Sequence, residues 1–412
     1  MSHSSSLDMP KTLTVLQKGA RAMAFKSLNL MQIGCLTIKE SFNEVGIEQF
    51  GPAQEGQIHA TVEVKHPHFY ARLLKGGSIA AAEAYMDGWW DSPDLTAVME
   101  LMARNLAALD KLEAQSSIVM RWLNQMGHWL KRNSVGQAKQ NIEAHYDLGN
   151  DLYQTFLDKR MLYSSALYLN SADSLEQAQL NKMERLCQQL QLQASDHVLE
   201  IGTGWGAMAI YMAQTYGCKV TTTTISEEQF AYTQALVESL GLTDQITLLK
   251  QDYRQLTGQF DKLVSIEMIE AVGKAYLKSY IQQCNQLLKP QGLMAIQAIT
   301  ITDQRYDYYS NNVDFIQKYI FPGGFLPSIT ALTQMATRFS NLVVRNVFDI
   351  GLDYAHTLAD WRLRFEAALP EVQRLGYDER FIRMWRYYLC YCEGGFQART
   401  ISTIHMTFQK GA

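Results

Sequence analysis

The sequence contains no apolar run of about eighteen residues, and we therefore predict no membrane-spanning helix. Its first residues, M-S-H-S-S-S-L-D, lack the apolar stretch of a secretory signal, which predicts a cytoplasmic location. Lys and Arg do not outnumber Asp and Glu, and a net charge of -4 argues against general nucleic-acid binding. The six cysteines are scattered at spacings that suit neither a zinc site nor a thioredoxin-type pair, so we expect reduced thiols.

The remaining composition is that of a folded protein with two domains. The chain has 412 residues, of which 47% are hydrophobic and 19% charged, and no internal repeat is visible. Residues 1–135 are predicted to form a mixed, mostly helical domain with one strand-like piece, I-H-A-T-V-E-V. Polar and small residues replace the apolar pattern over 131–141, which places the boundary there and assigns 136–412 to the second domain.

Helix-like and strand-like segments alternate from about residue 175. The expected helices include 176–190 and a segment capped by Ser226, and the expected strands include 197–201, 246–252, 262–267 and 292–300. Such alternation predicts an α/β fold with a doubly wound parallel sheet. Ligands of these folds bind at the carboxyl ends of the strands, so we look for the functional residues there.

A glycine loop, L-E-I-G-T-G-W-G-A, follows the first of these strands and precedes a helix. Its glycines, which permit a tight turn and a close approach to a nucleoside, are Gly202, Gly204 and Gly206. The spacing differs from the dinucleotide fingerprint, and the next strand ends in T-T-T-T-I-S without the acid that holds the ribose of NAD. Both differences favour S-adenosylmethionine, with Glu200 near its amino acid or ribose and Asp252 and Tyr253 flanking the adenine. A structural glycine turn in another α/β protein is the alternative.

Two carboxylates interrupt an apolar strand end in V-S-I-E-M-I-E-A-V-G, residues 264–273. A buried carboxylate needs hydrogen-bond partners, or its pKa rises until it is neutral. Glu267 and Glu270 lie at the end of a strand, where the fold places its ligands. We therefore interpret them as site residues; the alternative is that they pair with surface lysines such as Lys274 and Lys278.

Five ordered stretches give the sequence a specific likeness. They are H-Y-D-L-G-N-D-L-Y (145–153), L-E-I-G-T-G-W-G-A (199–207), I-E-M-I-E-A-V-G (266–273), K-Y-I-F-P-G-G-F-L-P-S (318–328) and G-L-D-Y-A-H-T-L (351–358). Together they resemble the cyclopropane-fatty-acyl-phospholipid synthase and mycolic acid methyltransferase family, over about residues 145–408. A-E-A-Y-M-D-G-W-W, residues 82–90, is similar to the amino-terminal domain of the bacterial synthases.

The resemblance implies a class I S-adenosylmethionine-dependent methyltransferase that acts on the cis double bond of an unsaturated acyl chain. Attack of the alkene on the sulfonium methyl leaves a carbocation, so the pocket must exclude water and supply aromatic faces and a base. In the family, loss of a proton then closes a cyclopropane ring, and a bound bicarbonate is the base. The resemblance assigns Glu270 and Tyr354 to this bicarbonate, together with the backbone N–H of Ile299.

Further residues match the family's cofactor contacts. These are Tyr163, Ser164, Thr224, Ile225 and Gln229, and no metal ligand is implied. Glu267 lies where some relatives have glycine, and we expect it near the methionine end of the cofactor.

Three residues of the expected bicarbonate site depart from the commoner pattern. Ser165 replaces a cysteine, Gln297 a histidine, and Ala271 a histidine after the glutamate. Serine keeps the backbone N–H, and a glutamine amide still donates a hydrogen bond but cannot carry a proton. Ring formation is therefore one expected outcome. Methylation or methylenation without ring closure is the rival, and a methyltransferase for a soluble small molecule or a lipid-binding protein without activity is a more distant alternative.

A double bond within a leaflet requires contact with the membrane, which we expect at the inner face. Residues 118–132 have an apolar stripe bordered by Arg121, Lys131 and Arg132, a pattern typical of an interfacial helix. The same stripe could instead dock the small domain onto the large one. Resemblance to the bacterial synthases also implies a homodimer.

Overall fold

The computed structural model describes residues 13–42, 46–106 and 149–412. The chain divides into two compact units, which we call the first unit (Met1–Met126 with Tyr377–Thr400) and the second unit (Gly127–Gly376 with Ile401–Ala412). The predicted boundary near residue 135 lies outside the described residues. The segment 377–400, which the sequence pattern places in the second domain, clusters with the first unit.

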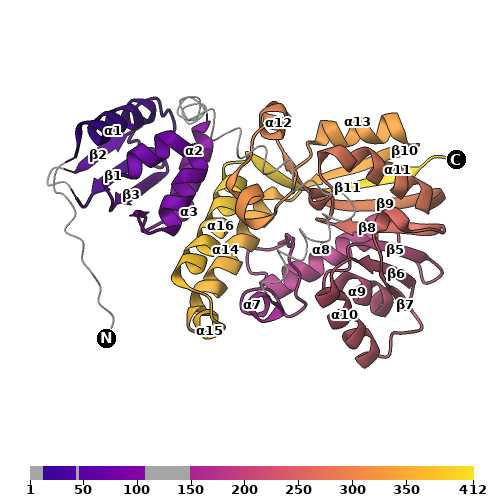
Figure 1. The fold of residues 1–412 in the computed structure, drawn as a ribbon. Helices are drawn as coiled ribbons and strands as arrows, with labels where there is room; N and C mark the ends of the chain where they lie inside the picture. The colour runs from indigo at the N-terminus through magenta and orange to yellow at the C-terminus, as the bar shows by residue number, and fades with distance from the viewer. Residues whose placement is uncertain (1–12, 43–45, 107–148) are drawn as a thin grey trace. The chain divides into compact units, whose positions relative to one another are not determined.

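The first unit combines a small sheet with helices (Figure 1). Its elements are α1 (Val15–Leu28), β1 (Cys35–Glu40), β2 (Ile47–Phe50), β3 (His59–Val64), α2 (Phe69–Met86), β4 (Trp90–Asp91), α3 (Leu95–Arg104) and α16 (Glu379–Gln397). The sheet has the order β2-β1-β3-β4, with β1 and β3 parallel. Of these strands, only β3 was anticipated from the sequence; β1, β2 and β4 were not.

Helix α16 is packed closely within the first unit. The Thr96 hydroxyl donates a hydrogen bond to the Glu393 carboxylate over 3.1 Å, and the Arg383 guanidinium donates to the Tyr85 carbonyl. A Cβ atom added to Gly394 would lie 2.5 Å from the backbone nitrogen of Glu100. Glycine at this position is what allows α16 to approach α3 so closely.

The second unit contains a seven-stranded sheet of order β10-β11-β9-β8-β5-β6-β7. The strands are β5 (His197–Ile201), β6 (Lys219–Thr224), β7 (Ile246–Lys250), β8 (Phe260–Ile266), β9 (Leu288–Ile301), β10 (Leu342–Asp349) and β11 (Ile401–Lys410). Strands β9, β8, β5, β6 and β7 are parallel, and β11 runs antiparallel between β9 and β10. The predicted α/β fold with a doubly wound sheet is confirmed.

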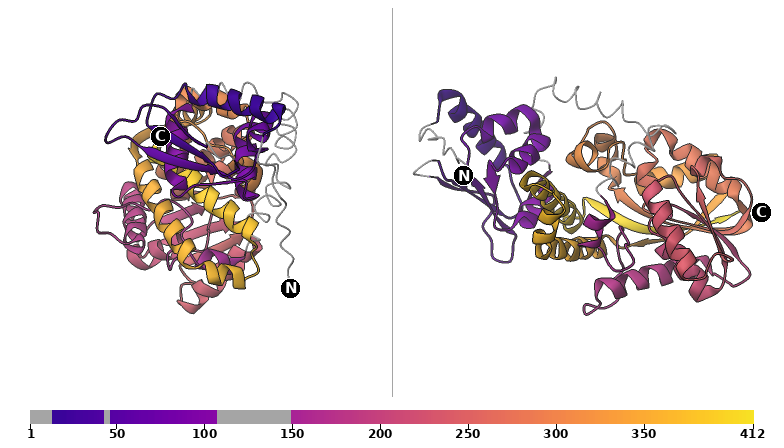
Figure 2. Two further views of the ribbon diagram at one scale, coloured as in Figure 1. Left: turned by 90° about the vertical axis from the view of Figure 1, so that its left-hand side faces the viewer. Right: turned by 60° about the horizontal axis from the view of Figure 1, so that its bottom comes forward.

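Helices cover both faces of this sheet (Figures 1 and 2). The helices of the second unit are α7 (Asn150–Gln154), α8 (Leu175–Leu190), α9 (Ala207–Tyr216), α10 (Glu227–Ser239), α11 (Leu277–Leu287), α12 (Asp303–Ser310), α13 (Ile329–Phe339), α14 (Gly351–Ala367) and α15 (Leu369–Arg374), of which α8, α9, α10, α11 and α13 cover the sheet. Buried residues of α8 and α9 pack with Val198 and Val264 on one face, and those of α11 and α13 pack with Leu199 and Leu263 on the other. The Ser226 side chain caps α10, as predicted.

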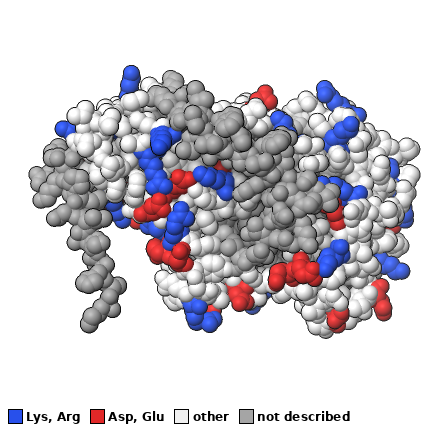
Figure 3. All heavy atoms as spheres, viewed as in Figure 1, with Lys and Arg blue, Asp and Glu red and all other residues white. Residues whose placement is uncertain are grey.

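The state of the cysteines and the distribution of surface charge agree with what the sequence predicts. All six cysteines are free thiols, five of them buried. On the face drawn in Figure 3, basic and acidic residues are interspersed over the described part of the chain, and neither sign forms a continuous patch there.

The close approach of α16 to α3 predicts the effect of a single methyl group. Gly394→Ala should lower the free energy of unfolding by about 2 kcal/mol, because the new Cβ atom meets backbone rather than a flexible side chain. Urea denaturation followed by circular dichroism measures this change. The matched control is Gly19→Ala on α1, where a Cβ atom meets nothing within 4 Å and helix propensity favours alanine. Equal stability of the two variants would contradict the packing argument.

Candidate active site

The glycine loop lies at the carboxyl end of β5, between β5 and α9. Gly202, Gly204 and Gly206 all have positive φ angles, of 100°, 53° and 89°. A Cβ atom on Gly206 would come within 2.7 Å of the Thr233 side chain, whereas one on Gly204 would meet no atom within 4 Å. The loop thus needs glycine for its backbone and presents an open surface at Gly204, which fits the close approach of a nucleoside.

The other predicted cofactor residues lie at neighbouring strand ends. At the end of β6, the Thr224 hydroxyl donates a hydrogen bond to the Gln229 side chain over 2.9 Å, with Ile225 between them. After β7, the Asp252 carboxylate accepts hydrogen bonds from the Arg254 guanidinium, and the Tyr253 ring packs edge-on against Tyr280. The parallel strands bring these residues to one edge of the sheet, as the sequence pattern predicted.

Glu200 is buried within β5 and bonds inside the sheet. Its carboxylate accepts a hydrogen bond of 2.6 Å from the Thr222 hydroxyl of β6. Burial raises the pKa of Glu200 to about 8. Its described hydrogen bond therefore ties two strands below the glycine loop, and a direct contact with a cofactor stays a prediction.

Glu267 follows β8 directly and has a left-handed backbone, with φ of 48°. Non-glycine residues adopt this conformation at a cost of about 1–2 kcal/mol. Its backbone N–H donates to the Gln297 carbonyl of β9 over 2.8 Å, which fixes the turn at the strand end. The residue is of intermediate exposure, so its carboxylate lies at the edge of the packed interior.

Three donors from different segments converge on the Glu267 carboxylate. Its Oε1 atom accepts a hydrogen bond of 2.9 Å from the Ser165 backbone N–H and one of 2.7 Å from Gln297 Nε2. Its Oε2 atom accepts one of 2.9 Å from the Tyr354 hydroxyl of α14. Burial raises the pKa of Glu267, while these three donors and the charge of Lys182 favour its ionised form.

Gln297 is held in place by His405, a residue that the sequence analysis did not single out. The two residues are register partners on β9 and β11, and His405 Nε2 lies 2.9 Å from Gln297 Oε1. Burial lowers the pKa of His405 to about 3, so the ring is neutral and its Nε2–H donates to that oxygen. The Gln297 amide is thereby oriented with its NH₂ group toward Glu267.

Glu270 lies three residues after Glu267, and its carboxylate has fewer hydrogen-bond donors. Its Oε1 atom accepts a hydrogen bond of 2.5 Å from the Ile299 backbone N–H, and its buried Oε2 atom has no partner among the described residues. Burial and the neighbouring charge of Glu267 raise the pKa of Glu270 to about 8. At neutral pH the proton of this pair therefore resides on Glu270, and Glu267 is the ionised member.

Lys182 of α8 is a second functional candidate that the sequence analysis missed. Its side chain is fully buried, and its Nζ atom donates a hydrogen bond of 2.6 Å to the Ser164 hydroxyl. Burial lowers the pKa of Lys182 to about 8, against the opposing charges of Glu267 and Asp158. In the sequence this lysine is indistinguishable from a solvent-facing helix residue, so only the fold reveals it.

Aromatic side chains line the same region. The ring of Tyr163 lies 5.2 Å from that of Tyr153 and 5.3 Å from that of Trp361, measured between centroids. Trp361 in turn contacts Tyr354 edge-on at 6.0 Å. Tyr354 therefore joins an aromatic cluster, which can face a cation, to the carboxylate of Glu267.

The residues expected to hold a bicarbonate are brought together, but their donors form hydrogen bonds to the protein's own carboxylates. Ser165, Gln297 and Tyr354 donate to Glu267, and the N–H of Ile299 donates to Glu270. Glu267, expected beside the cofactor's methionine end, thus occupies the centre of the expected anion site. This donor set does not fit an additional anion.

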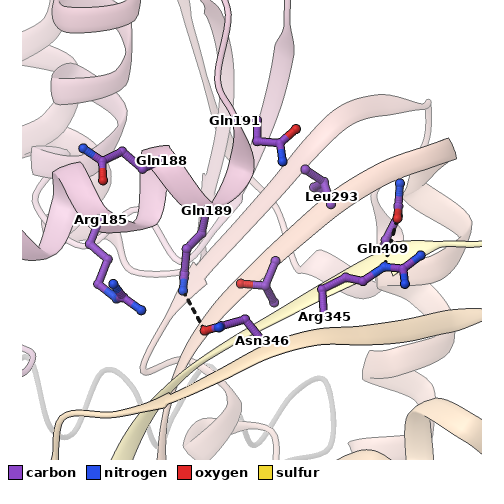
Figure 4. Close-up of a pocket in the computed structure, with 9 residues that line it drawn as sticks. Arg185, Gln188, Gln189, Gln191, Leu293, Arg345, Asn346 and Gln409 are labelled. Atoms are coloured by element: carbon purple, nitrogen blue, oxygen red, sulfur yellow. Dashed lines mark hydrogen bonds between the residues drawn. The ribbon is translucent and has the colours of Figure 1, made fainter.

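A hollow lies away from these residues, between α8 and the β9–β11–β10 part of the sheet (Figure 4). It is lined by polar side chains such as Gln189, which hydrogen-bonds Asn346 over 3.1 Å, and Arg185, which stacks on Phe348. None of the predicted site residues lines it. We therefore assign the active site to the carboxyl edge of the sheet, where Glu267 and Glu270 lie.

The raised pKa of Glu270 predicts a pH dependence of stability. Between its ordinary value of 4.5 and about 8, the folded protein retains a proton that the unfolded chain releases, so wild-type stability falls as pH rises through this window. Glu270→Gln removes this dependence. The free energy of unfolding of wild type should therefore fall between pH 5 and pH 8 by roughly 1–3 kcal/mol more than that of Glu270→Gln. Urea denaturation at both pH values measures it, with exposed Glu238→Gln as the control. If the difference in the free energy of unfolding between wild type and Glu270→Gln is the same at both pH values, Glu270 does not carry the proton at neutral pH.

Comparison with known proteins agrees with this geometry. The model of the mycolic acid cyclopropane synthetase family matches residues 133–406. Cyclopropane-fatty-acyl-phospholipid synthase of Escherichia coli K12 is 38% identical over 380 residues, which cover 89% of this chain and 92% of that protein. Tuberculostearic acid methyltransferase UfaA1 of Mycobacterium tuberculosis is 37% identical over 347 residues, 82% of this chain and 80% of that protein.

A solved structure aligns with about two thirds of this chain. The crystal structure of mycolic acid cyclopropane synthase CmaA1 complexed with SAH and CTAB aligns with a TM-score of 0.62 at 27% identity, covering 66% of this chain and 98% of that chain. The chain therefore belongs to the mycolic acid cyclopropane synthetase family of S-adenosylmethionine-dependent methyltransferases.

Proposed function

We propose that this enzyme adds the methyl carbon of S-adenosylmethionine to the cis double bond of an unsaturated phospholipid acyl chain and closes a cyclopropane ring. The observation that carries the proposal is the Glu267 carboxylate, held by three hydrogen-bond donors beside an aromatic cluster at the carboxyl edge of the sheet. The name of the Escherichia coli relative, identical at 38% of positions over most of both chains, supports the substrate class.

The residues of the chain fit each requirement of this reaction. S-adenosylmethionine, when bound, supplies an electrophilic methyl group, and the open glycine loop is where its nucleoside fits. An alkene needs no base to attack, but the resulting carbocation within the acyl chain needs aromatic faces, a role that we assign to the packed rings of Tyr163 and Trp361. Packing of these rings also excludes water, which would otherwise capture the cation.

A bound bicarbonate, which the family resemblance implies, is assigned no step here. The four groups expected to donate to it are engaged by Glu267 and Glu270. The homodimer implied by the same resemblance stays a prediction.

A second candidate keeps the cofactor and the lipid but stops at methylation. The relative named tuberculostearic acid methyltransferase, 37% identical over 347 residues, supports it. Gln297 in place of an ionisable histidine is the feature of this chain that motivates it. The two candidates differ only in the fate of the cation.

Contact with the inner face of the membrane is a further part of the proposal. Among the described residues, no helix is both long and apolar enough to cross a bilayer. The interfacial helix expected over 118–132 lies outside the described residues. Support comes instead from α1, where Val15 and Leu16 are 88% and 85% exposed and Lys18 and Lys26 lie on the same helix.

The products formed in cells test the chemistry. We expect that expression in bacteria with cis-monounsaturated phospholipids and no cyclopropane synthase of their own yields fatty acids with upfield ring-methylene signals in proton NMR. Vinylidene or branched-methyl signals without ring protons would instead establish the second candidate. Unchanged fatty acids, despite soluble protein that binds S-adenosylhomocysteine, would refute both.

The exposed apolar residues of α1 predict a membrane contact. Replacing Val15 and Leu16 by Glu should weaken binding to vesicles of mixed zwitterionic and anionic phospholipid at least about fivefold, because apolar insertion is lost and repulsion is added. Sedimentation with the vesicles measures the bound fraction. Leu240→Glu, at an exposed leucine that follows α10, is the control. Equal binding of both variants and wild type would show that α1 does not contact the lipid.

A further inference from the structure

The donors at the active site point to a role for Glu267 that the family resemblance does not assign. We propose that the Glu267 carboxylate is itself the base that removes the proton during ring closure, so that no bound anion is required. This inference rests on the proposed function. Ser165, Gln297 and Tyr354 hold the carboxylate as they would hold a separate oxyanion, at 2.7–2.9 Å.

One oxygen of Glu267 is suited to accept the proton. The Oε1 atom already accepts two hydrogen bonds, from the Ser165 N–H and from Gln297. Among the described residues, the Oε2 atom accepts one, from the Tyr354 hydroxyl. Tyr354 also contacts Trp361 of the aromatic cluster. The Oε2 atom is therefore the carboxylate oxygen that Tyr354 links to the aromatic rings to which we assign the cation. We assign the proton to Oε2.

The step balances without any other reactant. The π electrons of the alkene form a bond to the methyl carbon, and the S–CH₃ bonding pair remains on sulfur, which leaves a cation on the adjacent acyl carbon. A C–H bond of the new methyl group then breaks. Its proton moves to Oε2 of Glu267, and its electron pair forms the second C–C bond, which closes the ring.

The backbone at Glu267 supports a chemical role over a merely structural one. Its φ of 48° is a conformation that glycine adopts without strain, yet the chain has a carboxylate here and satisfies it with three donors. Strained residues of this kind cluster at functional sites. The competing interpretation is that Glu267 only ties the Ser165 loop, β9 and α14 together.

His405 is a positioning residue in this arrangement. Its Nε2–H holds Gln297 Oε1, so that the Gln297 NH₂ group donates both to Glu267 and to the Ser165 carbonyl, the latter over 3.1 Å. The flipped amide would present its oxygen to the carboxylate and repel it. Neutral His405 thereby favours the ionised state of Glu267 over a proton-sharing one.

The first experiment measures the turnover of the wild-type enzyme on vesicles of cis-monounsaturated phospholipid in carbon-dioxide-free buffer, with and without added bicarbonate. We expect the two rates to agree within twofold. A loss of tenfold or more on removal of carbon dioxide, restored by bicarbonate, would overturn the assignment of the base but leave the proposed function intact. Absence of any product would refute the proposed function and the base together.

The second experiment changes the carboxylate. Glu267→Gln, which preserves shape, and Glu267→Gly, which suits the backbone, should each lower turnover about 100-fold or more. Binding of S-adenosylhomocysteine, measured by calorimetry, should stay within threefold of wild type. Exposed Glu238→Gln, the same chemical change on α10, controls for charge.

Rescue separates a base from a structural tie. Formate or bicarbonate should restore the turnover of Glu267→Gly at least tenfold in a concentration-dependent manner, and chloride should not. A Glu267→Gly variant that binds S-adenosylhomocysteine but is not rescued by either anion would assign Glu267 a positioning role and overturn the proposal. If this variant does not bind, Glu267→Gln decides: turnover within threefold of wild type would overturn the proposal, and a 100-fold loss with intact binding would support it.

Discussion

Two carboxylates three residues apart share the carboxyl end of β8, and their mutual repulsion governs the site. In a poorly solvated environment both cannot be ionised at neutral pH, so the pair holds one proton. The donors decide where that proton lies: three converge on Glu267 and one reaches Glu270. The loop before α8, the strand β9 and the helix α14 must all be correctly placed for this asymmetry to exist. The site therefore depends on the correct packing of several distant segments and not on one local motif.

The same asymmetry explains why neutral groups surround an acid. A histidine at the position of Gln297 would titrate along with the carboxylates, whereas an amide donates at every pH. His405 is buried in the strand beside it and kept neutral. Its charge state is thus decoupled from the pair. Lys182 supplies the positive charge that burial of Glu267 requires, from the fully buried face of α8.

Much of the second unit was predictable because its signals are local. Apolar periodicity marked α8 and the strands, Ser226 marked the start of α10, and the glycine loop marked the carboxyl edge. The residues Ser165 and Gln297 were found through the family resemblance, but their common target was not, because sequence order does not show which donor faces which carboxylate. His405 carries no local signal, since it acts through its register with Gln297. The short strand β1 was missed because it is stabilised by parallel pairing with β3, which lies further along the chain, and the four-residue strand β2 was missed because, among the described strands, it pairs only with β1.

The path of the chain adds a condition on when the site can form. The chain leaves the second unit after Gly376, contributes α16 to the first unit, and returns at Ile401 as β11. β11 is inserted between β10 and β9, so the sheet stays split until that last strand has been synthesised. During translation, the Gln297 amide has no histidine to orient it until residue 405 leaves the ribosome. The orientation of the active-site amide therefore depends on the same pairing of β11 with β9 that joins the two parts of the sheet.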